Sequence, residues 1–190
     1  NLSSIRVITD TANSNDCDTN CPTKSLASYV SDNGGYAGIN GSYFCPPDYS
    51  SCSGSVNSFN APVYNSNLAK WINQDSLSSE SGLIAFTNSG GNFYTYSAGF
   101  SGLGGMEASI GNFPGLVRDG NSIVDNYGLD PGQKTKGTRG GVGFKGSTVY
   151  LVIARSASVY DLANIFIAIG ATHALNLDGG GSSAMYYNGG

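Results

Sequence analysis

The sequence predicts an α+β fold: one domain with a mixed or antiparallel sheet, rich in hairpins, and two or three packed helices. Three observations predict it. Short apolar or aromatic runs alternate with glycine-containing turns, only two segments have helical spacing, and no long linker or internal repeat divides the 190 residues. We therefore treat residues 1–190 as a single domain, a size at which folding buries well over half of the unfolded surface.

The N-terminal third alternates strand and helix signals. A short strand is expected over residues 5–9, and a helix over residues 24–32, where three apolar side chains share one face and an Asn-Gly-Gly run ends the pattern. Residues 36–44 return to strand character. Residues 50–67 are rich in Ser and Asn, so we expect a polar loop there.

Three hairpins are expected in the rest of the chain. Each joins two short runs across a turn rich in Gly, Asn or Ser. The paired runs are residues 82–87 with 92–97, 115–118 with 122–124, and 140–144 with 148–154.

The most regular part of the sequence is residues 137–190, which contain a hairpin, a helix and then a strand. Ser158 is expected to cap an amphipathic helix over residues 158–170. A short apolar strand at residues 174–177 then leads into a glycine run, and residues 184–187 resume the strand pattern.

Composition excludes some classes of function. Thirteen acidic residues against nine basic ones give a net charge of −4, and no run of Lys or Arg offers a stripe for nucleic acid. No segment approaches the roughly 20 apolar residues that cross a bilayer. Low charge with abundant Ser, Asn, Gly and Tyr leads us to expect a secreted or extracellular protein, such as one at a bacterial or viral surface.

The four cysteines form two close pairs, Cys17 with Cys21 and Cys45 with Cys52. An even number of cysteines favours disulfides in an oxidising compartment. Short Cys spacings also suit zinc, but these are not the spacings of common zinc ribbons and no His lies nearby. The connectivity stays open between local pairing and crossed pairing.

A glycine run near the C-terminus is the first candidate for a site. It reads Asn176-Leu177-Asp178-Gly179-Gly180-Gly181-Ser182-Ser183. The preceding strand would deliver the Asp178 carboxylate at its end, and glycines without Cβ atoms expose backbone N–H groups that can bind a phosphate or a sugar. An ordinary turn with a capping Asp is the alternative. The glycine spacing is not that of a nucleotide P-loop.

Two further polar residues stand beside glycines. The Asn40 amide, at the end of a predicted strand, can donate to and accept from a sugar hydroxyl or phosphate. The Arg139 guanidinium suits a phosphodiester through two parallel hydrogen bonds. His173 is the only histidine, and without a Gly-x-Ser-x-Gly motif we interpret it as a connector between helix and strand rather than a triad member.

These segments together resemble the phosphodiester glycosidase family, in the order in which that family has them. Asn40-Gly41-Ser42-Tyr43-Phe44 resembles its Asn-Gly-Gly-Phe-Phe-like strand end. Residues 115–120 are similar to its Leu-Val-x-x-Gly hairpin, residues 139–143 to its Arg-Thr-Ala-Ile-Gly segment, and residues 174–183 to its glycine signature. The resemblance extends from about residue 35 to the end. The chain departs from it at Gly140, where Thr is usual, and at Ser42 and Tyr43, where Gly and Phe are common.

The resemblance implies hydrolysis of the glycosidic C1–O bond of a sugar-1-phosphodiester, of the N-acetylglucosamine-1-phosphodiester type, without a cofactor or a metal. Asp178, Arg139 and Asn40 are then the expected catalytic residues. Substrate-binding roles are expected for the backbone amides of the glycine run and for two further side chains: Asn176, Gly179, Gly180, Gly181, Ser182, Ser183 and Glu107, the last as a second carboxylate. The expected partner is a carbohydrate phosphodiester, and the oligomeric state stays open.

Two rival functions remain. A non-catalytic carbohydrate- or cell-envelope-binding module on the same fold would use the many Tyr residues to stack on sugars. A phosphodiesterase that attacks phosphorus usually needs a metal pair held by His and Asp clusters, and a chain with one His does not favour it.

Overall fold

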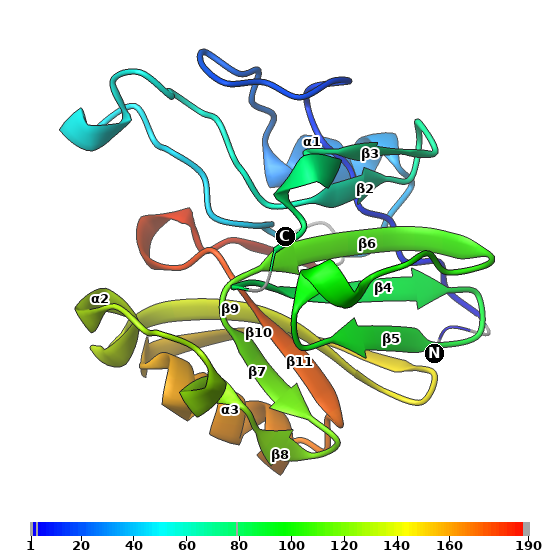
Figure 1. The fold of residues 1–190 in the computed structure, drawn as a ribbon. Helices are drawn as coiled ribbons and strands as arrows, with labels where there is room; N and C mark the ends of the chain where they lie inside the picture. Colours follow the sequence, from blue (N-terminus) through cyan, green and yellow to red (C-terminus); the bar gives the residue numbers. More distant parts are fainter. Residues whose placement is uncertain (1, 3, 79, 188–190) are drawn as a thin grey trace.

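Two five-stranded sheets face each other, and one long helix covers the outer face of the second sheet (Figure 1). The computed structural model describes residue 2, residues 4–78 and residues 80–187. The first sheet has the order β3-β2-β6-β4-β5, with bounds β2 Val63–Asn65, β3 Lys70–Ile72, β4 Gly82–Thr87, β5 Gly91–Tyr94 and β6 Met106–Asn112. The second has the order β10-β9-β11-β7-β8, with bounds β7 Gly115–Arg118, β8 Asn121–Ser122, β9 Gly137–Lys145, β10 Thr148–Ala157 and β11 His173–Leu177.

The remaining elements are three α-helices and a two-stranded ribbon. The helices are α1 Leu26–Asp32, α2 Pro131–Lys134 and α3 Val159–Ala168, and the ribbon pairs β1 Ala37–Ile39 with β12 Met185–Tyr187. All strand pairs among the described residues are antiparallel. The predicted α+β class is therefore confirmed. No helix in the described ranges combines the length and the apolar character needed to cross a membrane.

The core has two layers. Between the sheets, Ile84 and Phe86 of the first pack with Val142, Phe144 and Leu175 of the second. Beneath the second sheet, α3 buries an apolar stripe against Leu116, Val124 and Ala174, with Leu162 and Phe166 fully buried. Burying one such side chain contributes about 1.5–3 kcal/mol. A Cβ at Gly141 would lie only 2.7 Å from the Phe166 ring, so glycine is what lets α3 approach this closely.

The start of α3 follows the predicted cap. The Ser158 hydroxyl accepts the Asp161 N–H at 3.2 Å, and the Asp161 carboxylate accepts the Ser158 N–H at 2.9 Å. These hydrogen bonds from Ser158 lower the pKa of Asp161, as in a capping box. The three predicted hairpins are present as β4/β5, β7/β8 and β9/β10.

Two predicted strands were wrong in whole or in part, and in both places side-chain hydrogen bonds take the place of backbone ones. Residues 5–9 form no strand. The Thr9 hydroxyl donates to the carbonyl of Tyr64 and accepts the N–H of Ser109, so a side chain makes the hydrogen bonds that a neighbouring strand would make. The expected strand over residues 36–44 stops at Ile39. Beyond it the Tyr43 N–H donates to the Asn112 side chain at 3.2 Å instead of to a neighbouring strand.

Two polar strands of the first sheet escaped prediction. The expected loop over residues 50–67 contains β2, whose Val63 and Asn65 are both buried. Strand β6 was missed because its small and polar residues do not form an apolar strand pattern in the sequence. Its Ser109 is fully buried and donates its hydroxyl to the Ile84 carbonyl at 2.9 Å. A buried polar group with a hydrogen-bond partner costs little, so polarity here does not indicate exposure.

Both disulfides are local. Cys17 bonds Cys21, and Cys45 bonds Cys52. Because no free cysteine remains among the described residues, the alternative of a cysteine zinc site is excluded.

Candidate active site

The site forms where β11 ends and the glycine run begins. In the ladder between β11 and β9, Leu177 pairs with Gly140. One step further along each chain stand Asp178 and Arg139, which therefore lie side by side. Asn176 is the penultimate residue of β11, and Asp178 directly follows the strand. The carboxylate, the guanidinium and a buried amide thus share one corner.

Asn40 holds the glycine run at both of its ends. Its Nδ2 donates to the Asp178 carbonyl at 2.9 Å, and its Oδ1 accepts the Ala184 N–H at 3.0 Å. The Asp178 N–H in turn donates to the Gly41 carbonyl at 2.9 Å. The structure therefore gives Asn40 the task of positioning the run, and its expected contact with substrate stays a prediction.

The Asp178 carboxylate is half-buried and has only neutral hydrogen-bond donors. It accepts the Gly179 N–H at 2.8 Å and a bond from the Ser182 hydroxyl. No ion pair joins it to a basic side chain in the described ranges. Burial raises the pKa of Asp178, and the two donors offset only part of that rise. A carboxyl group with a raised pKa in such a position is suited to acid–base or nucleophilic work.

Only part of the glycine run offers free backbone amides. The N–H groups of Gly179, Ser182 and Ser183 already bond within the run. Those of Gly180 and Gly181 have no acceptor in the part of the chain that the structure describes. A Cβ at residue 179 would lie 2.8 Å from the Thr138 carbonyl oxygen, so only glycine fits beside β9. Two amides, not five, are available to an anion.

Arg139 keeps one nitrogen free. Its Nε donates to the Ala157 carbonyl at 3.3 Å, and its Nη2 donates to the carbonyls of Gly132 and Thr135. Its Nη1 makes no hydrogen bond to any described residue and lies 3.5 Å from the position of a Cβ on Gly179. The predicted grip through two nitrogens is thus not available in this arrangement, whereas a contact through Nη1 is.

Asn176 is too deep to touch a substrate. Its side chain is 0% exposed, and its Nδ2 donates to the Phe113 carbonyl at 2.9 Å and to the Tyr43 hydroxyl at 2.8 Å. Its carbonyl accepts from Asn112 at 2.9 Å. The expectation of direct substrate contact does not fit this burial. Asn176 instead holds Tyr43, whose pKa is raised by burial and is further influenced by the charges of Arg139 and Asp178.

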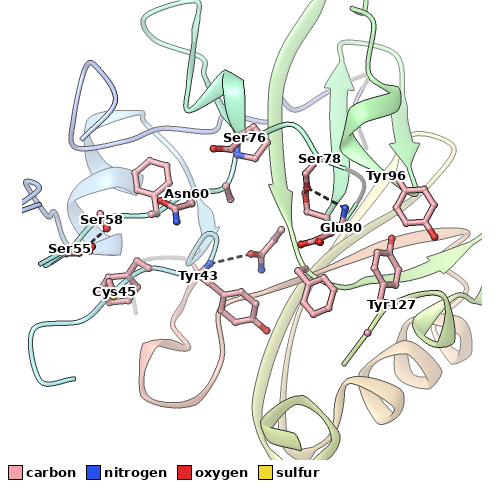
Figure 2. Close-up of a pocket in the computed structure, with 18 of the residues that line it drawn as sticks. Tyr43, Cys45, Ser55, Ser58, Asn60, Ser76, Ser78, Glu80, Tyr96 and Tyr127 are labelled. Carbon is pink, nitrogen blue, oxygen red and sulfur yellow. Dashed lines mark hydrogen bonds between the residues drawn. The ribbon is translucent and has the colours of Figure 1, made fainter. Parts of the chain in front are cut away.

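A cleft of about 880 Å³ opens next to this corner (Figure 2). Its volume is within the usual range of ligand sites. Figure 2 shows Tyr43 on one side and Glu80, Tyr96 and Tyr127 on the other. Asp178 and Arg139 do not line the cleft themselves. Tyr43 connects the two places, because it lines the cleft and is bonded to Asn176.

The lining of the cleft is largely uncharged. It combines aromatic rings with hydroxyl and amide groups, and Glu80 is its one charged side chain among the described residues. A surface of this kind suits a neutral polar ligand such as a sugar, because it offers hydrogen bonds and ring faces without an opposing ionic charge.

Two other titratable residues lie away from the corner. Glu107 stands near the start of β6, at the opposite end of that strand from Asn112, with its carboxylate 3.9 Å from Arg6 Nε. It is not brought together with Asp178. His173 begins β11 and is likewise distant along that strand. No group of three or more His, Cys, Asp or Glu residues in the described ranges is arranged to hold a metal ion.

Sequence reasoning passed over three residues that the structure brings to the site. Gln133 was recognisable in principle, because Asp130-Pro131-Gly132-Gln133 has the spacing of a capping box and α2 is capped in this way. Tyr43 and Asn112 gave weaker signals. Tyr43 lies four residues beyond β1 and Asn112 is the last residue of β6, and only the fold shows that both meet Asn176.

The sequence profile of the phosphodiester glycosidase family matches residues 33–190. The chain belongs to the phosphodiester glycosidase family. The match contains Asn40, Arg139, Asp178 and the whole glycine run, so the corner described above lies within the family's domain. No curated protein sequence matches the chain.

Two solved structures have a similar fold. One is the zebrafish N-acetylglucosamine-1-phosphodiester alpha-N-acetylglucosaminidase catalytic domain, with a TM-score of 0.61 and 15% identity over 80% of this chain and 53% of that one. The other is a hypothetical protein from Synechocystis, with a TM-score of 0.52 and 15% identity over 90% of this chain and 51% of that one. The chain spans about half the length of each, and at this identity the likeness shows the fold alone.

Proposed function

We propose that this phosphodiester glycosidase domain hydrolyses a sugar-1-phosphodiester, of the N-acetylglucosamine-1-phosphodiester type named for the zebrafish relative, at the glycosidic C1–O bond. The observation that carries the proposal is a half-buried carboxylate that has no ion pair and lies in the same corner as unused hydrogen-bond donors. The free N–H groups of Gly180 and Gly181 follow Asp178 in the chain, and Arg139 Nη1 lies 3.5 Å from the position of a Cβ on Gly179. All of these residues are within the matched family domain.

The chemistry explains why one carboxylate is enough. Ordinary glycosidases use two carboxyl groups, one of which protonates a poor alkoxide leaving group. In a sugar-1-phosphodiester the C1–O bond breaks with its electron pair going to oxygen, and the leaving group is a phosphate monoester, already a stable anion. Donors at Arg139 and the glycine run stabilise that anion as it departs.

Asp178 then acts on the sugar side. Its carboxylate faces the developing positive charge at C1 as nucleophile, base or electrostatic stabiliser, and the oxygen of water ends on C1 while one proton of water is released. Burial disfavours the ionised carboxylate, so its charge is more strongly stabilised once a positive centre forms next to it. Asn40 contributes by holding the backbone of Asp178 in place.

Hydrolysis in water labelled with ¹⁸O tests the bond that breaks. With the methyl phosphodiester of N-acetylglucosamine as substrate, we expect the label in the sugar product. Label in the phosphate product would mean attack at phosphorus and would contradict the proposal. The variant Glu107→Gln, which removes a carboxylate distant from the corner, is the control and should keep the wild-type rate.

A carbohydrate- or envelope-binding module is the second candidate, favoured by the uncharged aromatic cleft. It predicts affinity without turnover. If no sugar-1-phosphodiester is hydrolysed, and Asp178→Asn binds the same ligands as strongly as wild type, the binding module replaces the hydrolase as the better account.

A further inference from the structure

We infer that the Tyr43 hydroxyl determines substrate specificity by donating a hydrogen bond to an oxygen of the uncharged sugar part of the substrate in the adjoining cleft. This inference rests on the proposed function, because it concerns which sugar the same site accepts.

The Asn176 amide has only one workable orientation. Its Nδ2 lies 2.9 Å from the Phe113 carbonyl oxygen. A flipped amide would place oxygen against oxygen at that distance, so the nitrogen must face Phe113, and the same nitrogen lies 2.8 Å from the Tyr43 hydroxyl. Asn176 therefore donates to Tyr43, and the phenol oxygen is the acceptor.

Gln133 is fixed in the same manner. Its Oε1 accepts the Asp130 N–H at 3.2 Å in the capping box of α2, which leaves its Nε2 to donate to Tyr43 at 3.4 Å. A phenol oxygen has two acceptor positions and one proton. With two amides donating to that oxygen, the proton has to point away from both.

That proton has no acceptor in the described part of the chain, since Tyr43 makes no other side-chain hydrogen bond there. Tyr43 also lines the cleft (Figure 2). Burial raises the pKa of Tyr43, so the proton remains on the oxygen at ordinary pH. We assign the O–H group to the cleft, which Tyr43 lines.

The charge of the cleft lining indicates that the acceptor is part of a sugar and not a phosphate. A phosphate is expected at Arg139 and the glycine run, where the free donors are, whereas the cleft has no basic side chain among its described lining residues and carries Glu80. An anion is disfavoured next to Glu80. A sugar hydroxyl or acetamido oxygen suits the position, and it would sit between the aromatic side chains of the two walls.

Tyr127 provides a matched control. It lines the same cleft and burial raises its pKa as well, but its hydroxyl donates to the Thr95 carbonyl. Tyr43→Phe and Tyr127→Phe each remove one buried hydroxyl. Only the first removes a proton that the fold leaves unused.

The experiment measures affinity by calorimetry in the Asp178→Asn background, so that turnover does not interfere. The probes are the methyl phosphodiesters of N-acetylglucosamine, glucose, galactose and mannose, the phosphate-free methyl glycosides, and monodeoxy analogues of the tightest binder. Tyr43→Phe should weaken the tightest binder about 2- to 10-fold, as expected for one neutral hydrogen bond. One monodeoxy analogue should bind equally to both proteins, whereas Tyr127→Phe, which keeps its ring on the cleft wall, should not single out any one monodeoxy analogue.

Uniform weakening across every analogue would show that Tyr43 only supports the fold, and would overturn the inference. So would unchanged affinity, no measurable binding of any probe, or an effect that vanishes for the phosphate-free glycosides, which would place the acceptor on phosphate. Failure of the proposed function is separate. A wild-type protein that never hydrolyses these phosphodiesters would refute the hydrolase and leave a selective effect of Tyr43 on sugar affinity intact.

Discussion

The two ends of β11 carry titratable side chains that respond to burial alike but have different surroundings. Burial lowers the pKa of His173 at one end and raises that of Asp178 beyond the other, so both are shifted toward their neutral forms. The His173 ring is in contact with a partner on its face and at both of its nitrogens. Its ring stacks on Phe144 with centroids 4.8 Å apart, its Nε2 lies 3.3 Å from an Asp119 oxygen, and its Nδ1 lies 3.1 Å from the Thr172 hydroxyl.

The surroundings of Asp178 still contain free hydrogen-bonding groups. Its own donors are neutral, and the donors nearby, Arg139 Nη1 and two glycine amides, have no acceptor among the described residues. A pKa shift alone therefore does not distinguish a site from a structural residue. Unused donors beside the shifted residue favour a binding site, because the N–H groups of the exposed Gly180 and Gly181 can reach a ligand from solvent. Four experiments test this contrast, and the one with the strongest expected change comes first.

Asp178→Asn should lower turnover of a sugar-1-phosphodiester at least about 100-fold, since the charge at C1 loses its stabiliser. The fold should not suffer. The folded pKa of Asp178 lies above its unfolded value, so ionisation destabilises the protein as pH rises through that window. The neutral amide removes this penalty. At pH 7, the unfolding midpoint should equal or exceed that of wild type, and a large decrease would contradict a catalytic reading.

Asn176→Leu should be the most damaging to stability. The side chain is similar in size, but it leaves the Phe113 carbonyl and the Tyr43 hydroxyl without their buried donor. One unsatisfied buried group costs about 1–3 kcal/mol, and chemical denaturation measures the loss. A variant as stable as wild type would show that the amide network does not hold this corner.

The rate of turnover should also depend on pH through the ionisation of Asp178. If the Asp178 carboxylate must be ionised, the rate falls as pH drops through its pKa, and burial places that limb above the usual range of an aspartate. The rate against pH should therefore decline at higher pH than an exposed carboxyl would allow. A limb that Asp178→Glu leaves at the same pH would assign the titration to another group.

His173→Gln should change turnover by less than about twofold, because the residue lies at the closed end of β11. Its effect is on stability. The folded pKa of His173 lies below its unfolded value, so stability is fully present above about pH 6.5 and is lost as pH falls through the folded pKa. The variant should weaken this acid-side decline in unfolding midpoint. A large loss of turnover would instead place His173 in the mechanism.

Much of this could be predicted from the sequence because the signals were local. The Ser158 cap, the apolar stripe of α3 and the glycine turns each depend on residues a few positions apart, and the structure has all of them. Strands β2 and β6 could not be found in this way. Their buried Asn65 and Ser109 look like loop residues until partners from distant segments satisfy them.

The candidate site also combines features that local sequence predicts with features that depend on distant contacts. Local sequence was enough to predict that Asp178 follows a strand, that glycines come after it, and that Asn40 and Arg139 belong to the same family pattern. Which hydrogen-bonding atoms of these residues remain free depends on the tertiary structure. It left Arg139 one nitrogen and the glycine run two amides, it buried Asn176, and it placed two amide donors on the Tyr43 hydroxyl. Hydrogen bonds between distant segments determine which polar atoms stay unpaired, and a local sequence pattern cannot predict those bonds.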